Sequence, residues 1–247
     1  MYSWAGKRGC FVLVLTILSI VSLASAGTVT IQPIQVCDNT GNNCADASRE
    51  LYETVGDKIW AQAGIDLFFL PWVTFNSTAF QTIDSDVELY SLWLGAGHGA
   101  NPSSSVISMW FVSSLGDPST YGSSEWLTPP PHGGDRATIA DNVFSSGRLD
   151  TIAHEIGHEL GLDHYDVLYP SATDIASNLM SQGGVRTTPT SIDQITPDSP
   201  YLDQLTAAQI AIADSSGLDI PEPVTLALMG AALAVLALLR RRFTGVC

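Results

Sequence analysis

The chain has 247 residues, and its charge already excludes one large class of partners. Residues 27–220 contain five of the ten basic residues and 24 of the 25 acidic ones, which gives this part a net charge of about −19. So acidic a domain repels nucleic-acid phosphates, and it has no basic stripe to offset the repulsion. We therefore expect no nucleic-acid partner. Solubility explains the charge most simply; Ca²⁺ binding or attraction to cationic substrates is an alternative without specific support.

The first 26 residues have the pattern of a cleavable secretory signal peptide. Lys7 and Arg8 precede an apolar run over 10–21, and a stretch of small residues ends at Ala26. The run is shorter than the ~20 residues that a membrane-spanning helix needs, so cleavage after Ala26 is favoured over an uncleaved anchor.

The other end also indicates export. Residues 224–239 are uninterruptedly apolar or small, and three arginines follow at 240–242. Such a run has no polar face for a surface helix, and it can span a bilayer if flanking residues snorkel. The arginines would stay on the cytoplasmic side and leave the rest of the chain outside. We therefore divide the chain into a signal peptide (1–26), one domain (27–217) and a C-terminal sorting segment (218–247).

In the first half of the domain, strand and helix patterns alternate. Residues 28–36 alternate well enough to form a first strand. Asp46 or Ser48 would cap a helix that runs through 49–63, with Gly64 following its last turn. Four more segments have the apolar pattern of buried or half-buried strands: 65–70, 88–94, 106–112 and 136–144.

Two helices are predicted in the second half. The first runs over 148–160 with Ser145 or Ser146 as its cap, and the second over 205–215 with Thr206 as its cap. Polar, loop-rich segments lie on both sides of the first helix, at 113–135 and 169–200. This order of elements favours an α/β or α+β domain.

The most informative segment, 154–164, reads His-Glu-Ile-Gly-His-Glu-Leu-Gly-Leu-Asp-His. His154 and His158 are four residues apart, so on a helix they project from one face, one turn apart. Two imidazole nitrogens at that spacing can reach one zinc ion at roughly 2.0–2.1 Å. Glu155 lies beside them, where its carboxylate can contact a water in an open coordination position.

A third ligand six positions after His158 cannot come from the same helical face, so the chain must turn. Gly161 can adopt the left-handed conformation that ends the helix and brings His164 back. Three neutral imidazoles leave one coordination position for water, which is typical of a catalytic zinc and not of a structural one. The sequence therefore predicts one Zn²⁺ ion held by His154, His158 and His164.

The complete pattern, H-E-x-x-H-x-x-G-x-x-H, resembles the signature of the metzincin zinc peptidases and is most similar to the matrixin-like branch. The resemblance implies a twisted mixed sheet packed on an early helix and an active-site helix, with a C-terminal helix. It implies that Glu155 is the general base of peptide-bond hydrolysis. It also implies that Met180, after Asn178 and Leu179, forms the methionine turn beneath the imidazoles, although an ordinary core methionine is the alternative.

This sequence departs from the metzincin pattern in places. Tyr165 follows the third histidine, where several subfamilies carry another diagnostic residue, and Gln182 stands where some branches have an extra tyrosine ligand. The subfamily is therefore open. His98 and His132 fit no second metal site and are interpreted as loop residues.

Cys37 and Cys44 are the cysteines of the domain, with six residues between them in a polar loop. In an oxidising compartment a local disulfide is the default for such a pair. The alternative is that one thiolate caps the zinc ion and keeps the protein silent.

Pro221-Glu222-Pro223, the apolar run and the arginine cluster together resemble the PEP-CTERM sorting signal of certain Gram-negative bacteria. That resemblance implies processing by a membrane-embedded exosortase during export to the cell surface or extracellular matrix; a plain membrane anchor is the alternative. Extracellular or cell-surface proteins and peptides are then the expected substrates. Two other functions compete, a catalytically silent zinc-binding surface or matrix protein and an adhesive or carbohydrate-binding module.

Overall fold

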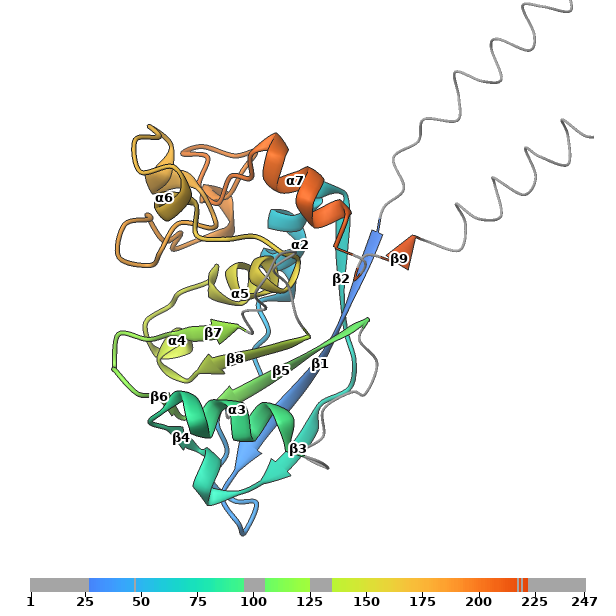
Figure 1. The fold of residues 1–247 in the computed structure, drawn as a ribbon, viewed down its shortest axis with the longest axis vertical. Helices are drawn as coiled ribbons and strands as arrows, with labels where there is room; N and C mark the ends of the chain where they lie inside the picture. The colour runs from blue at the N-terminus through green and yellow to red at the C-terminus, as the bar shows by residue number, and fades with distance from the viewer. Residues whose placement is uncertain are drawn as a thin grey trace, which may run out of the picture. The chain divides into compact units, whose positions relative to one another are not determined.

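The structure, a computed structural model shown in Figure 1, describes residues 27–46, 48–95, 105–124, 135–216, 218 and 220–221. Within these residues, seven strands form one sheet. Its order is β2 (Ile65–Phe69), β1 (Gly27–Cys37), β5 (Val106–Val112), β8 (Arg136–Ala140) and β7 (Gly122–Ser124), and both β3 (Val73–Asn76) and β9 (Ile220–Pro221) also pair with β1. The pairings are parallel except for β7 with β8 and β9 with β1. The sheet is therefore mixed, and its last strand, β7, is antiparallel.

The remaining regular elements of the described part are short. Two strands, β4 (Thr82–Ile83) and β6 (Ser114–Leu115), pair in parallel as a separate small sheet. The helices are α2 (Glu53–Trp60), α3 (Asp86–Leu94), α4 (Asn142–Ser145), α5 (Thr151–Glu159), α6 (Tyr165–Leu168) and α7 (Ala207–Asp214). Single 3₁₀ turns lie at Ala61–Ala63, Thr78–Phe80, Ile175–Ser177 and Ile192–Gln194.

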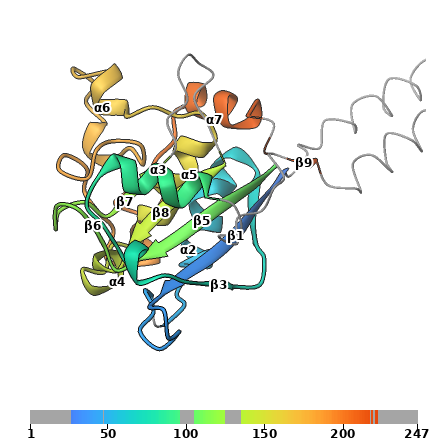
Figure 2. The same cartoon turned by 60° about the horizontal axis from the view of Figure 1, so that its bottom comes forward.

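Apolar side chains on the two faces of the sheet form two cores. Along β5, Met109 and Phe111 belong to one core and Trp110 to the other, because successive strand residues point to opposite faces. Helices α2 and α5 bury their apolar sides in the first core and α3 does so in the second. Figures 1 and 2 show α3 on one side of the sheet and α2 and α5 on the other. The arrangement holds α5, which carries His154 and His158, against β7 and β8.

Much of the predicted architecture is confirmed. The fold class is α+β. A mixed sheet packs on an early helix, α2, and on the helix of the histidine motif, α5, and the domain has a C-terminal helix, α7. The strands predicted at 28–36, 65–70 and 106–112 are β1, β2 and β5. Gly64 has φ 67° and ends the turn after α2 as expected. Thr206 caps α7 in a capping box with Gln209.

The prediction of a strand at 88–94 is wrong, because these residues form most of α3. Ser85 caps this helix by accepting a hydrogen bond from the backbone N–H of Glu88. Leu89, Leu92 and Trp93 are buried at the 3- and 4-residue spacing of one helix face. The spacing Ser-x-x-Glu at the start of this segment is a sequence signal for a helix, and it outweighs the apolar pattern that favours a strand.

The predicted caps of two other helices are also wrong. The helix expected from Asp46 or Ser48 begins only at Glu53, because Asp46 and Tyr52 have φ values of 43° and 48° that a right-handed helix cannot contain. The carboxylate of Asp46 accepts hydrogen bonds from the Ser48 hydroxyl and from the Glu50 N–H, which closes a local turn.

Similarly, the strand expected over 136–144 ends at Ala140, where α4 follows. Ser145 and Ser146 lie at the end of α4, and their hydroxyls donate to the carbonyl of Asn142, its first residue; they do not cap α5, which begins at Thr151.

Cys37 and Cys44 form the expected disulfide, with their Cα atoms 3.9 Å apart. Both sulfurs are therefore committed, and neither is a thiolate that could cap a metal ion.

The segments predicted as signal peptide and sorting tail lie outside the described residues, apart from Leu218 and the two residues of β9. The described residues belong to a compact unit over Gly27–Glu222. The backbone of β9 pairs with the first residues of β1, Gly27 and Thr28. In the part of the chain that the structure describes, no helix is both long enough and apolar enough to cross a membrane. The membrane span predicted at 224–239 is not among those residues and stays a prediction.

Candidate metal centre

The three histidines of the motif meet at one point. His154 and His158 project from α5, and Gly161, at φ 90°, turns the chain so that His164 returns to them. The Nε2 atom of His158 lies 3.2 Å from that of His154 and 3.2 Å from that of His164. Two nitrogens bound to a tetrahedral zinc at ~2.0–2.1 Å are about 3.3 Å apart, so the donor set fits this ion. Among the described residues, it is the one group of three or more candidate ligand side chains.

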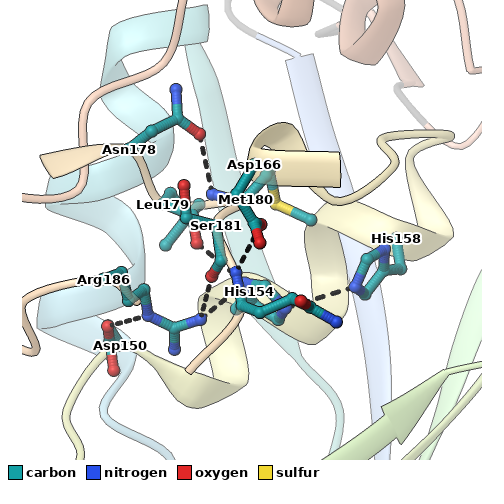
Figure 3. Close-up of polar contacts among 10 residues, drawn as sticks. Asp150, His154, His158, Asp166, Asn178, Leu179, Met180, Ser181 and Arg186 are labelled. Carbon is teal, nitrogen blue, oxygen red and sulfur yellow. Dashed lines mark hydrogen bonds and ion pairs between the residues drawn. The ribbon is translucent and has the colours of Figure 1, made fainter. Parts of the chain in front are cut away.

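Hydrogen bonds fix the orientation of two of these rings, that of His154, shown with Leu179 in Figure 3, and that of His158. The Nδ1 atoms of His154 and His158 lie 2.7 Å from the carbonyl oxygens of Leu179 and Leu162. A carbonyl only accepts, so each Nδ1 carries the proton and each Nε2 keeps its lone pair for a metal. Burial lowers the pKa of both histidines, which favours the neutral rings that metal binding needs.

His164 is less buried than the other two, and burial lowers its pKa as well. The neighbouring His158 acts in the same direction, because a positive charge on one ring disfavours protonation of the other. All three rings are therefore poised to be neutral near neutral pH.

Arg186 also contacts His154. Its Nη1 lies 2.8 Å from His154 Nδ1, but a guanidinium only donates, so this contact competes with the Leu179 carbonyl for the same ring nitrogen. Nη1 has an acceptor of its own in the Ser181 carbonyl, at 2.9 Å (Figure 3). We therefore assign the Nδ1 proton of His154 to the bond with Leu179.

Glu155 lies between the histidines and the edge strand β7. Its side chain is buried, and its carboxylate accepts a hydrogen bond from the Ser124 hydroxyl at 2.5 Å. Burial raises its pKa to about 7, while the Ser124 hydrogen bond and the positive charge of Arg186 act in the opposite direction. A carboxyl group in this range can take up and release a proton near neutral pH.

Strand β7 approaches this carboxyl so closely that a side chain at one position would displace it. A Cβ atom on Gly122 would lie 2.5 Å from Oε1 of Glu155 and 2.7 Å from Cδ and Cγ. Gly122 and Ser124 therefore define where the Glu155 side chain can lie. Neither was singled out from the sequence, because both are at least 30 positions away from the motif that they support.

Met180 is fully buried and packs against α5. A Cβ atom on Gly157 would lie 2.4 Å from its sulfur, which places the thioether against the helix between the two histidine turns. The Met180 N–H donates to Asn178 Oδ1, and its carbonyl accepts from the backbone N–H of Tyr165, the residue after His164. The turn with Met180 is thus connected to the third histidine as well as to the helix.

A buried charged network that the sequence pattern does not predict supports the same turn. Arg186 pairs with Asp150 at 2.7 Å, with side-chain exposures of 3% and 0%. Burial raises the pKa of Asp203 to about 8, and the negative charge of Asp150 and a hydrogen bond with it act in the same direction. A neutral Asp203 donates a hydrogen bond to Asp150. Only Asp150 then carries a negative charge, and this charge balances the positive charge of Arg186. The network joins the start of α5 to the loop after Met180.

The structure thus brings together all the residues that the sequence assigned to the site. His98 and His132 lie outside the described residues.

Several solved structures are similar to the chain at low identity. Metalloproteinase-II from Bacteroides fragilis is 16% identical, with 78% of this chain and 53% of that chain covered and a TM-score of 0.46. Archaemetzincin from Archaeoglobus fulgidus, complexed with malonate, is 16% identical, with 74% and 99% covered and a TM-score of 0.36. A chaperone–substrate complex is 12% identical, with 78% and 34% covered and a TM-score of 0.45. The chain thus spans about half the length of metalloproteinase-II and about a third of the length of the matched chain in the chaperone–substrate complex.

No curated protein sequence matches the chain. Residues 219–242 match the model of the PEP-CTERM protein-sorting motif. The prediction of such a motif is therefore confirmed, and the chain carries a PEP-CTERM sorting segment.

Proposed function

We propose that the chain is a zinc-dependent endopeptidase that hydrolyses peptide bonds of extracellular or cell-surface proteins. One observation carries this proposal: three imidazole groups converge beside a buried carboxyl group, with Nε2 of His158 3.2 Å from Nε2 of both other rings. A purely structural zinc site would have four protein ligands and no use for Glu155.

His154, His158 and His164 would hold the ion. A zinc ion in such a site supplies Lewis acidity, which lowers the pKa of a bound water and polarises a carbonyl group. Glu155 takes up the proton of the attacking water on its carboxylate and passes it to the leaving amine. The Ser124 hydroxyl holds that carboxylate in place, and the Nδ1 bonds to Leu179 and Leu162 orient two of the rings.

Strand β7 is the element on which an extended substrate would lie. It is the last strand in the order of the described sheet, it is antiparallel, and it contacts Glu155 directly. A peptide that pairs with this edge would receive backbone hydrogen bonds and would place its scissile bond near the carboxyl group.

The sorting motif supports a location outside the cytoplasm. We propose that the signal peptide is removed after Ala26 and that an exosortase-type enzyme processes the tail. The protein would then be anchored in the membrane transiently and act at the surface of a Gram-negative cell or in its matrix.

The test measures bound zinc and the cleavage of a randomised peptide library by the wild-type protein and by Glu155→Ala. Glu53→Ala, an exposed residue of α2, is the matched control. We expect one zinc per chain in all three proteins and cleavage that disappears only in Glu155→Ala. Bound zinc without cleavage in any of them would instead favour the catalytically silent zinc protein, and a protein without zinc would favour the adhesive module.

A further inference from the structure

Arg148 differs from the other basic residues of the domain. Four of the five basic residues of 27–220 have an acceptor: Arg49 with Gln35, Lys58 with Asp198, Arg136 with Asp135, and Arg186 with Asp150. Among the described residues, no carboxylate, carbonyl or hydroxyl accepts a hydrogen bond from the Arg148 guanidinium, and its Nε is buried without a partner. A half-buried cation that lacks a counter-charge is costly unless something else pairs with it.

The guanidinium lies between β7 and the loop that follows Met180. It stacks over the ring of Tyr121, 4.2 Å from the centroid. Gly183 also lies close to it, since a Cβ atom there would be 2.9 Å from Nη2. Contact with an aromatic face leaves the in-plane N–H donors of the two Nη atoms free to pair with a ligand, whereas Nε is buried.

Both neighbours of Arg148 belong to the surroundings of the metal centre. Tyr121 directly precedes Gly122, whose missing side chain makes room for the Glu155 carboxyl. Gly183 is three residues after Met180, in the loop that Arg186 joins to Asp150 at the start of α5. Because Tyr121 is the chain neighbour of Gly122 and consecutive Cα atoms are about 3.8 Å apart, Arg148 lies beside the start of β7, the strand on which a peptide would meet Glu155.

We propose that Arg148 binds a carboxylate of the substrate next to the scissile bond; this inference rests on the proposed peptidase function. A guanidinium matches a carboxylate with two parallel hydrogen bonds, which supplies specificity as well as affinity. The domain is strongly acidic, but charges on its far side are screened over the ~8–10 Å Debye length, so the local cation decides. The carboxylate is either the side chain of an internal Asp or Glu, or the free C-terminus of a peptide.

The experiment uses the full-length, zinc-loaded protein and a randomised peptide library made in two forms, with free and with amidated C-termini. The sequences of the products give the preference at each position around the cut bond. Arg148→Gln removes the charge, Arg148→Lys keeps it without the planar fork, and Arg49→Gln removes an exposed charge that lies elsewhere. Melting temperatures show whether each variant is folded.

We expect the wild-type protein and Arg49→Gln to prefer acidic over amide side chains within two positions of the cut bond by roughly 10- to 100-fold, the effect of a charged hydrogen-bonded pair. Arg148→Gln should lose this preference, and Arg148→Lys should keep part of it. If the free C-terminus is the ligand, the wild-type protein instead cleaves peptides with a free C-terminus in preference to amidated ones. Equal profiles in the wild-type protein and a folded Arg148→Gln would overturn the inference and leave the peptidase intact, whereas no cleavage by the wild-type protein would overturn the proposed function itself. If Arg148→Gln does not fold, Arg148→Lys provides the test. The inference is refuted if Arg148→Lys and the wild-type protein give equal cleavage profiles in both libraries and neither profile shows an acidic preference.

Discussion

The close approach of β7 to Glu155 makes Gly122→Ala a sharp test of how the site is built. The new methyl group would lie 2.5 Å from Oε1 of Glu155, whereas an unstrained contact needs roughly 3.5 Å, so the carboxyl group must move by about 1 Å. The end of a glutamate side chain can move, and an alanine in a strand costs the fold little. The damage should therefore appear in the rate and not in the stability.

A displacement of about 1 Å of a reacting group costs roughly 100-fold in rate, or about 2.7 kcal/mol in the barrier. We expect kcat/KM for peptide hydrolysis to fall by about this factor in Gly122→Ala, with a melting temperature close to that of the wild-type protein. Gly184→Ala is the control, because a Cβ atom there meets nothing within 4 Å. Wild-type activity in a folded Gly122→Ala would refute the assignment of β7 as the strand that positions Glu155.

Three other perturbations test separate parts of the structure. Gly157→Ala places a Cβ atom 2.4 Å from the Met180 sulfur, so overpacking should lower the free energy of unfolding by about 1–3 kcal/mol in chemical denaturation, and an unchanged midpoint would contradict the packing. Removal of zinc by a chelator should lower the melting temperature, and added zinc should restore it, because a ligand that binds only the native state stabilises it; a melting temperature insensitive to zinc would refute this. The pKa of Asp203 is raised from 3.8 to about 8, so its stabilising contribution is fully present below about pH 4 and is lost as the pH rises through about 8. Asp203→Asn keeps the neutral form, so between about pH 5 and about pH 8.5 its free energy of unfolding should fall less than that of the wild-type protein, both measured without metal. An equal fall in both proteins would show that Asp203 is ionised in the fold.

The metal centre could be predicted because its information is local. The spacing of His154 and His158 belongs to one helix, and Gly161 is the residue type that the following turn requires, so three ligands follow from eleven consecutive positions. The disulfide between Cys37 and Cys44 closes an equally short loop.

The supporting residues could not be predicted, because they come from distant parts of the chain. Ser124 is 31 positions away from Glu155, and Arg186 is 36 positions away from Asp150. Nothing in the pattern around a serine in a loop or an arginine after a polar stretch identifies its partner. Tertiary packing decides these pairs.

The strand expected at 88–94 failed for another reason. Its leucine, tyrosine and tryptophan residues suit a strand and a helix equally, and the spacing from the Ser85 cap to Glu88 decides between the two.

The most direct test of the central claim is a zinc titration of the metal-free protein, followed by hydrolysis of a peptide library. Three convergent histidines predict that hydrolysis is absent without zinc, rises with added zinc and saturates at one ion per chain. Hydrolysis by the metal-free protein, or zinc binding that leaves the peptides intact at every ratio, would contradict the account.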